Sequence, residues 1–306
     1  RGRRRIVGVP PDLVSEGPGD PGLRDDKMLA PTRLVAAFIV PVLVSAFVIL
    51  YGFPGQTDDL WAWTISPEVT PMFMGAGYLA GAYFFARAAT TPAWHRVAVG
   101  FLGAIPFTAT LLGATVLHWD RFNHDHVSFW AWLSLYVSTP LLLPVLWVAN
   151  QRRDPGVPEV GDVVVPHALR LVVGGTGIVM LTWAAVVFAF PDVADRTWTW
   201  PLTDLTARTV SGFVVFPAVV LAWFLADDRW SSFRIPVETA MLDLALVVTC
   251  ALRRWDQLDP SDVTRWSYLA ALVVALGAMA GLYRAMERRR PRAVVEAEPA
   301  AGPGVP

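Results

Sequence analysis

Apolar residues fall in eight long, continuous runs separated by short polar segments. The runs lie near residues 33–53, 71–90, 97–117, 128–149, 169–190, 207–226, 235–252 and 266–285. Each has about the twenty residues that a helix needs to cross the hydrocarbon core of a bilayer. Continuous runs predict helices rather than strands, because a helix satisfies its own backbone hydrogen bonds in lipid. The pattern therefore predicts an all-α fold, a polytopic membrane bundle of about eight transmembrane helices.

The composition supports a membrane protein. Of the 306 residues, 54% are hydrophobic and 17% are charged, whereas an ordinary soluble domain has about 25% charged residues. These values exclude a water-soluble enzyme and a disordered chain. The formal net charge of −1 gives no basis for nucleic-acid binding. The expected partner is the lipid bilayer, and a membrane protein partner or a homo-oligomer is an open alternative.

Both ends of the chain are polar and lack a hydrophobic period. Residues 1–30 are rich in Pro, Gly, Arg and Asp, and residues 291–306 are rich in Pro and Ala, a composition typical of disordered tails. Met28 is the first methionine, which makes it an alternative natural start. We expect both tails to be disordered.

Basic residues are distributed unevenly between the two sides of the predicted bundle. If the N-terminus is inside, the inner segments carry 19 Lys and Arg residues and the outer segments carry 6. Loops with an excess of Lys and Arg remain cytoplasmic. The count predicts both termini in the cytoplasm, with the protein in the cytoplasmic membrane of a prokaryote.

The chain contains an internal repeat. A Phe-Pro pair, an Asp and a Trp-x-Trp motif follow the first apolar run at 53–63 and recur after the fifth run at 190–200, 137 positions later. A Trp-Asp pair at 119–120 recurs at 255–256, 136 positions later. So many matches in one register predict two tandem four-helix repeats, residues 31–155 and 166–290, that run in the same direction.

The outer loop between the third and fourth runs carries a candidate metal site. Within nine residues it places His118, Asp120, His124 and His126. Imidazole and carboxylate groups are ligands of zinc and other divalent metals. The competing interpretation is a solvated polar loop in which the aspartate caps a helix end. A divalent metal at this loop is the one cofactor that the sequence suggests.

Two acids interrupt the seventh run. Glu238 lies near its inner end, where it can pair with Arg234 one turn earlier. Asp243 lies deeper in the predicted membrane, where a charge costs at least ~2.5 kcal/mol on insertion scales and therefore suggests a function. Both are candidates for a transport pathway, and a structural acid bonded to neighbouring hydroxyl groups is the alternative.

Tryptophans gather near the predicted ends of the runs. Tryptophan is enriched at both bilayer interfaces, so we predict interfacial anchors at Trp61, Trp63, Trp119, Trp198, Trp200 and Trp255. The two Trp-x-Trp loops offer a second interpretation, in which they fold back on the membrane and line a pocket for a lipid or another apolar ligand.

Three function classes remain. The first is a transporter-like bundle for a small solute or proton, with Asp243 and Glu238 in its pathway. The second is a structural or accessory membrane protein that binds a partner or a lipid. The third is a membrane enzyme with an outward-facing metal site, which is the weakest because the chain lacks a phosphate-binding Gly-rich loop, a Gly-x-Ser-x-Gly motif and a His-Glu-x-x-His motif.

Overall fold

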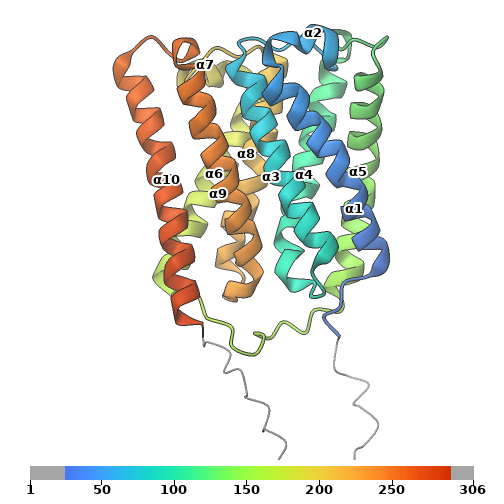
Figure 1. The fold of residues 1–306 in the computed structure, drawn as a ribbon, viewed down its shortest axis with the longest axis vertical. Coiled ribbons are helices and arrows are strands. Elements are labelled where there is room, and N and C mark those ends of the chain that lie inside the picture. Colours follow the sequence, from blue (N-terminus) through green and yellow to red (C-terminus); the bar gives the residue numbers. More distant parts are fainter. Residues whose placement is uncertain (1–24, 291–306) are drawn as a thin grey trace, which may run out of the picture.

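The computed structural model describes residues 25–290, which form a bundle of long helices (Figure 1). Apart from two isolated bridges, the described residues contain no β-structure. The helices with more than four residues are α1 (Ala30–Phe47, continued by a π-helical turn at Val48–Gly52), α3 (Val69–Thr90), α4 (His95–Leu117), α5 (Val127–Gln151), α6 (His167–Ala189), α8 (Asp204–Ala222), α9 (Trp230–Arg253) and α10 (Asp262–Arg289). Every predicted apolar run is therefore a helix.

The two ends of the bundle differ. Residues 25 and 290 lie at the same end, which we call the terminal end (Figure 1). The opposite end, the loop end, carries the one-turn helices α2 (Thr57–Leu60) and α7 (Ala194–Thr197). Short 3₁₀ turns accompany them at Pro54–Gln56, Trp119–Arg121, Pro191–Val193 and Trp255–Gln257, and another lies at Trp223–Leu225 near the terminal end.

Seven of the long helices are apolar and long enough to cross a membrane, and α3 is the long helix that is not among them. Its 22 residues include several Gly, Ala and Tyr, and 13 of them are buried. It packs against α1 on one side and α9 on another. A helix enclosed by protein meets little lipid, so its side chains pack mainly against other helices.

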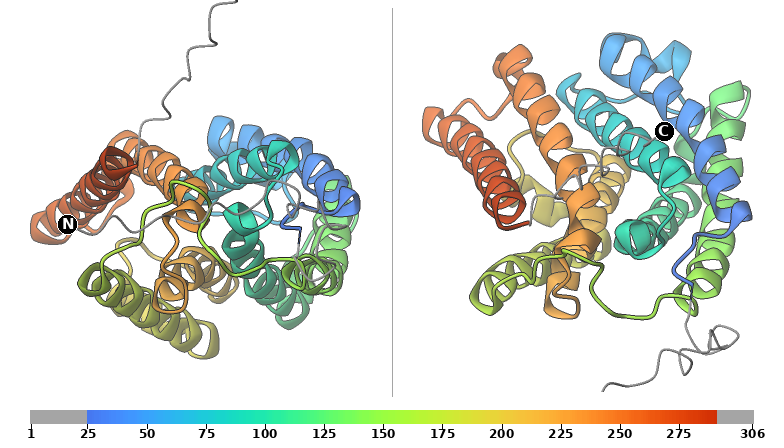
Figure 2. Two further views of the ribbon diagram at one scale, coloured as in Figure 1. Left: turned by 90° about the horizontal axis from the view of Figure 1, so that it is seen from below. Right: turned by 60° about the horizontal axis from the view of Figure 1, so that its bottom comes forward.

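The helices pack as pairs around a central group. Helices α3, α4, α8 and α9 are central, with α3 against α9 and α4 against α8 and α9. Each carries one outer partner, namely α1 on α3, α5 on α4, α6 on α8 and α10 on α9. Figure 2 shows the linker between α5 and α6 crossing the terminal end of the bundle.

Helices α6 and α8 approach one another closely because of a glycine. A Cβ placed on Gly177 would lie 2.3 Å from the backbone nitrogen of Ala222. Small residues at helix contacts let two backbones approach in lipid, where packing replaces the hydrophobic effect as the driving force. For Gly277 and Gly281 of α10, in contrast, no atom of the described part of the chain lies within 4 Å of such a Cβ.

The same hydrogen bonds occur twice along the chain, 136 or 137 positions apart. At the terminal end the Trp94 indole donates to Gln151 (3.0 Å), and the Trp230 indole donates to Glu287 (2.8 Å). The backbone N–H groups of His95 and Ser231 donate to Asp26 and Asp162, respectively. At the loop end, residues 123 and 259 donate to the carbonyls of residues 62 and 199.

The segment 25–29 belongs to the folded part of the chain, although it falls within the tail predicted for residues 1–30. Met28 is buried, and its N–H donates to the carbonyl of Pro92. Lys27 forms a bridge with Ala93. Residues 1–24 and 291–306, the other parts of the predicted tails, lie outside the described residues.

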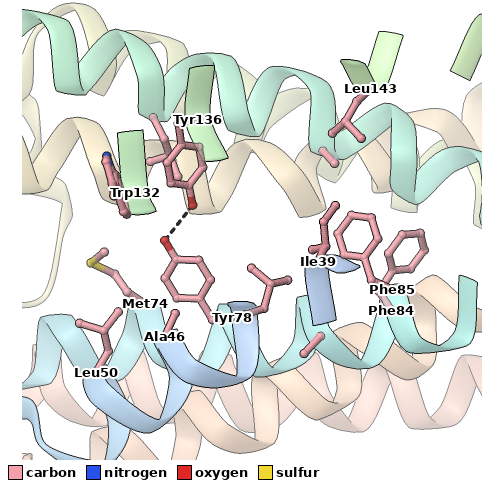
Figure 3. Close-up of a cluster of buried hydrophobic side chains, with 14 of the residues drawn as sticks. Ile39, Ala46, Leu50, Met74, Tyr78, Phe84, Phe85, Trp132, Tyr136 and Leu143 are labelled. Carbon is pink, nitrogen blue, oxygen red and sulfur yellow. Dashed lines mark hydrogen bonds between the residues drawn. The ribbon is translucent and has the colours of Figure 1, made fainter. Parts of the chain in front are cut away.

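Aromatic side chains fill the interior of the first four long helices. Figure 3 shows Tyr78 of α3 and Tyr136 of α5 pointing toward one another, with their hydroxyl oxygens 2.8 Å apart. Trp132 lies beside Tyr136 at a ring-centroid distance of 4.3 Å. Large rings of this kind pack together with aliphatic side chains between the α1–α3 and α4–α5 pairs.

Candidate functional site

A cavity of about 300 Å³ opens at the terminal end, between the first and second sets of four helices. This volume is at the lower end of the range for small-molecule sites. The walls come from α4, the end of α5, the linker, α6 and the residues that connect α8 to α9. Its ionisable lining residues are His95, Asp154, Arg170, Asp227, Asp228 and Arg229.

Arg229 forms the fixed wall of the cavity. Its guanidinium donates to both carboxylate oxygens of Asp154, at 2.9 and 3.0 Å, and to Asp227 at 2.8 Å. Burial by itself would raise the pKa of each aspartate, but the hydrogen bonds from Arg229 outweigh it, so both pKa values are lowered. Burial by itself would lower the pKa of Arg229, but the hydrogen bonds and charges of the two carboxylates raise it. All three groups are therefore charged and already paired.

Arg170 and Asp228 form the accessible part of the cavity. The Arg170 guanidinium donates through Nε and Nη2 to the carbonyls of Phe224 and Leu225, which ties α6 to the end of α8. Its remaining nitrogen, Nη1, is 3.7 Å from Asp228, whose side chain is 46% exposed. This loose pair leaves one guanidinium nitrogen and one carboxylate with spare hydrogen-bonding capacity.

His95 is held on both sides at the edge of the cavity. Its Nδ1 is paired with Asp26, and its Nε2 is 3.0 Å from the hydroxyl of Ser231. Glu159 of the linker lies 3.6 Å from the same Nε2 and also accepts from Arg96. The ring therefore connects the start of α4 to the linker and to the start of α9, and acts as part of the scaffold.

An apolar groove of about 320 Å³ adjoins the charged cavity. It lies between α4, α6 and α8, and its walls include Pro106, Leu181, Val219 and Ala222. All of its lining residues are apolar, and two of them, Leu102 and Trp223, also line the charged cavity. A charged cavity at the end of the bundle and an apolar groove along its side thus meet at two shared residues.

Glu238 is part of a polar network that joins α3, α9 and α10. Its carboxylate is paired with Arg87 and accepts hydrogen bonds from the hydroxyls of Tyr83 (2.6 Å) and Tyr283 (2.9 Å). The predicted pair with Arg234 is present at 3.6 Å. The network satisfies the charge of Glu238 within the protein.

Asp243 lies near the middle of α9, about 20 Å along the axis from Trp230 at 1.5 Å per residue. Among the described residues, none forms a hydrogen bond or an ion pair with its carboxylate. Neither Asp243 nor Glu238 lines the charged cavity or the apolar groove. The structure therefore does not bring these two acids together with the cavities.

The three histidines of the outer loop have different partners. His118 Nε2 lies 2.8 Å from the Arg208 guanidinium, and burial, followed by the charge of Arg208, lowers the pKa of His118. His126 Nδ1 lies 2.7 Å from Ser128. His124 packs its ring against Trp119 and Phe129.

Asp120 of the same loop is exposed. Among residues 25–290, no three His, Cys, Asp or Glu side chains are placed to hold a metal ion. A metal site on these residues would require the loop to rearrange.

The predicted tryptophan anchors divide into two groups. Trp61, Trp63 and Trp200 are buried, so they contribute to the interior rather than to a lipid-facing belt. The Trp200 indole donates to the hydroxyl of Thr70 at 2.8 Å. Trp119 is 41% exposed, whereas Trp198 and Trp255 are partly buried.

The sequence does not reveal the charged cavity, because its residues are far apart in the chain. Arg229 looks like any other basic residue of an inner loop, and Asp154 lies 75 positions before it. The one available signal was the concentration of acids among the arginines of the inner loops at 154–162 and 227–228.

No protein-family model matches the chain, and no curated protein or solved structure shows significant similarity to it. The charged cavity and the apolar groove are therefore the features that bear on its function.

Proposed function

We propose that this integral membrane protein binds an amphiphile, with the polar part in the charged cavity and the apolar part in the groove between α4, α6 and α8. The proposal rests on the junction of the two spaces at Leu102 and Trp223. A lipid has the same division between a polar head and an apolar chain. The protein is then an accessory membrane protein whose ligand is a lipid, which is the second of the three classes above.

The position of the charged cavity agrees with a lipid head group. It lies at the terminal end, where the apolar spans of α4 and α6 begin. We propose that this end faces the cytoplasm of a prokaryotic cell, since its segments carry most of the arginines. The ligand would then come from the cytoplasmic leaflet.

We also propose that residues 31–155 and 166–290 are tandem copies. The hydrogen bonds that recur at a spacing of 136 or 137 residues support this, as do the matching outer partners of the four central helices. The groove lies between α4 of the first copy and α6 and α8 of the second. It is therefore a site that neither copy forms alone.

A substitution in the groove tests the amphiphile proposal. We expect Leu181→Trp to fill the groove and to abolish retention of a tightly bound lipid when the protein is extracted from vesicles and weighed by native mass spectrometry. Val179→Trp is the matched control, since Val179 lies on the same helix and is 69% exposed. Retention that is equal in the two variants, or absent from the unmodified protein, would refute the proposal.

Transport is a second candidate, and it is favoured because Asp243 has no partner among the residues that the structure describes. An unpaired carboxylate at this depth is costly unless it binds a cation or a proton. In proteoliposomes loaded with a pH-sensitive dye, Asp243→Asn is expected to abolish proton flux, whereas Asp192→Asn at the exposed loop end is expected to leave it unchanged. Equal flux in both variants would exclude Asp243 from a pathway.

A further inference from the structure

We infer that the charged cavity selects a zwitterionic lipid with a primary ammonium group, such as phosphatidylethanolamine, over an anionic lipid. The inference rests on the amphiphile-binding function proposed above and specifies the head group. It follows from which charges in the cavity are already paired and which have capacity left for a ligand.

Most of the charged groups have no capacity for a ligand. Arg229 is satisfied by Asp154 and Asp227. Asp154 also accepts from the N–H of Gly156, and Asp227 also accepts from Ser232. An anionic ligand aimed at Arg229 would have to displace a carboxylate from a buried pair, and breaking such a pair by removing one partner is strongly unfavourable.

The ring of His95 is occupied as well. Asp26 lies at its Nδ1, and Ser231 and Glu159 lie at its Nε2. Its two nitrogens therefore offer no hydrogen bond to a ligand unless one of these contacts breaks.

Arg170 and Asp228 remain, and they carry opposite charges. Within residues 25–290, one guanidinium nitrogen of Arg170 has no hydrogen bond, and the half-exposed carboxylate of Asp228 lies 3.7 Å from it. A phosphate beside an ammonium has the complementary arrangement, because the phosphate can bind the guanidinium and the ammonium can bind the carboxylate. A head group that is only anionic would satisfy Arg170 and bring a negative charge next to Asp228.

The exposure of Asp228 sets the size of the expected preference. Because Asp228 is half exposed, its contact with an ammonium is screened. We expect the preference that depends on this residue to be modest, about threefold to fivefold.

Competition between lipids tests the inference. The full-length protein is reconstituted in vesicles with equal parts of phosphatidylethanolamine and phosphatidylglycerol of identical chains, and the retained lipid is identified by native mass spectrometry. We expect phosphatidylethanolamine to be retained about threefold to fivefold more often. Asp228→Asn is expected to remove this preference and still retain a lipid, while Asp192→Asn at the loop end is expected to keep it.

The outcomes separate the two proposals. Retention of both lipids in equal amounts, or a preference that survives in Asp228→Asn, would overturn the head-group inference and leave the amphiphile site intact. Loss of all retained lipid in the unmodified protein would overturn both. Vesicles containing phosphatidylcholine add one further arm, since its quaternary ammonium cannot donate a hydrogen bond to Asp228, and its retention is expected to fall between those of the other two lipids.

Discussion

Replacing Arg229 by Met should be among the most destabilising changes at the terminal end. The side chains of Arg229, Asp154 and Asp227 are 10%, 2% and 11% exposed, so the variant leaves two buried carboxylates without their cation. Breaking a buried ion pair by removing one partner costs about 3–5 kcal/mol. We expect a loss of this size in the free energy of unfolding at pH 7, measured by tryptophan fluorescence during unfolding in mixed micelles.

The dependence of this loss on pH follows from the pKa values. In the unmodified protein the pKa values of Asp154 and Asp227 are lowered. Their contribution to stability is therefore complete above the unfolded pKa near 3.8 and is lost as the pH falls through the lower folded pKa. Without Arg229, burial and mutual repulsion raise both pKa values, so the variant should recover stability as the pH falls from 8 to 5.

Two controls complete the test. Arg254→Met breaks the pair with Glu68, in which the side chains are 30% and 38% exposed, so a loss of no more than about 1 kcal/mol is expected. Asp154→Asn and Asp227→Asn added to Arg229→Met should restore most of the lost stability, because the triple variant buries no unpaired charge. A loss in Arg229→Met no larger than that in Arg254→Met would refute the reasoning.

Three further predictions follow from individual contacts. Gly177→Ala should lower the unfolding temperature, because the added Cβ would meet the backbone of α8. Gly175→Ala should leave the unfolding temperature unchanged or raise it, because no atom of the described residues lies within 4 Å of a Cβ at that position. Equal shifts in the two variants would contradict the close packing of α6 and α8. Tyr78→Phe should cost about 1–3 kcal/mol by leaving the Tyr136 hydroxyl unpaired, while replacing both tyrosines by Phe should cost less than either single change. In an NMR titration the pKa of His118 should lie below 6.5 and should rise in Arg208→Gln. The contribution of His118 to the free energy of unfolding should be complete above pH 6.5 and should decline as the pH falls below it. A pKa of His118 that does not respond to the Arg208 substitution would disprove the contact.

The helices were predictable because every helix that crosses a bilayer needs a continuous run of apolar residues. All eight apolar runs are helices, and the largest error in their ends is at the start of α9, which begins at Trp230 rather than near residue 235. This start was missed because the residues at 230–234 include two serines and an arginine, whose polar groups are satisfied by distant partners. Ser231, for example, donates its hydroxyl hydrogen to Asp162.

The candidate site was not predictable in the same way. Asp243 and the histidines stand out in the sequence, because an acid in an apolar run and three histidines in one loop are local patterns. The charged cavity depends on contacts such as Asp154 with Arg229 and on the meeting of α4 with α8, and neither leaves a local pattern. The direction of side chains was equally hidden, since Trp61 and Trp63 occupy interfacial positions in the chain but point into the protein.

The enclosure of α3 by other helices has a consequence for synthesis of the protein in the cell. Of its 22 residues 13 are buried, and α1 and α9 enclose it. At 5–20 residues per second, α9 leaves the ribosome on the order of ten seconds after α3. During that interval only α1 and the helices just made can cover α3, so its final packing depends on a partner that is still to be translated.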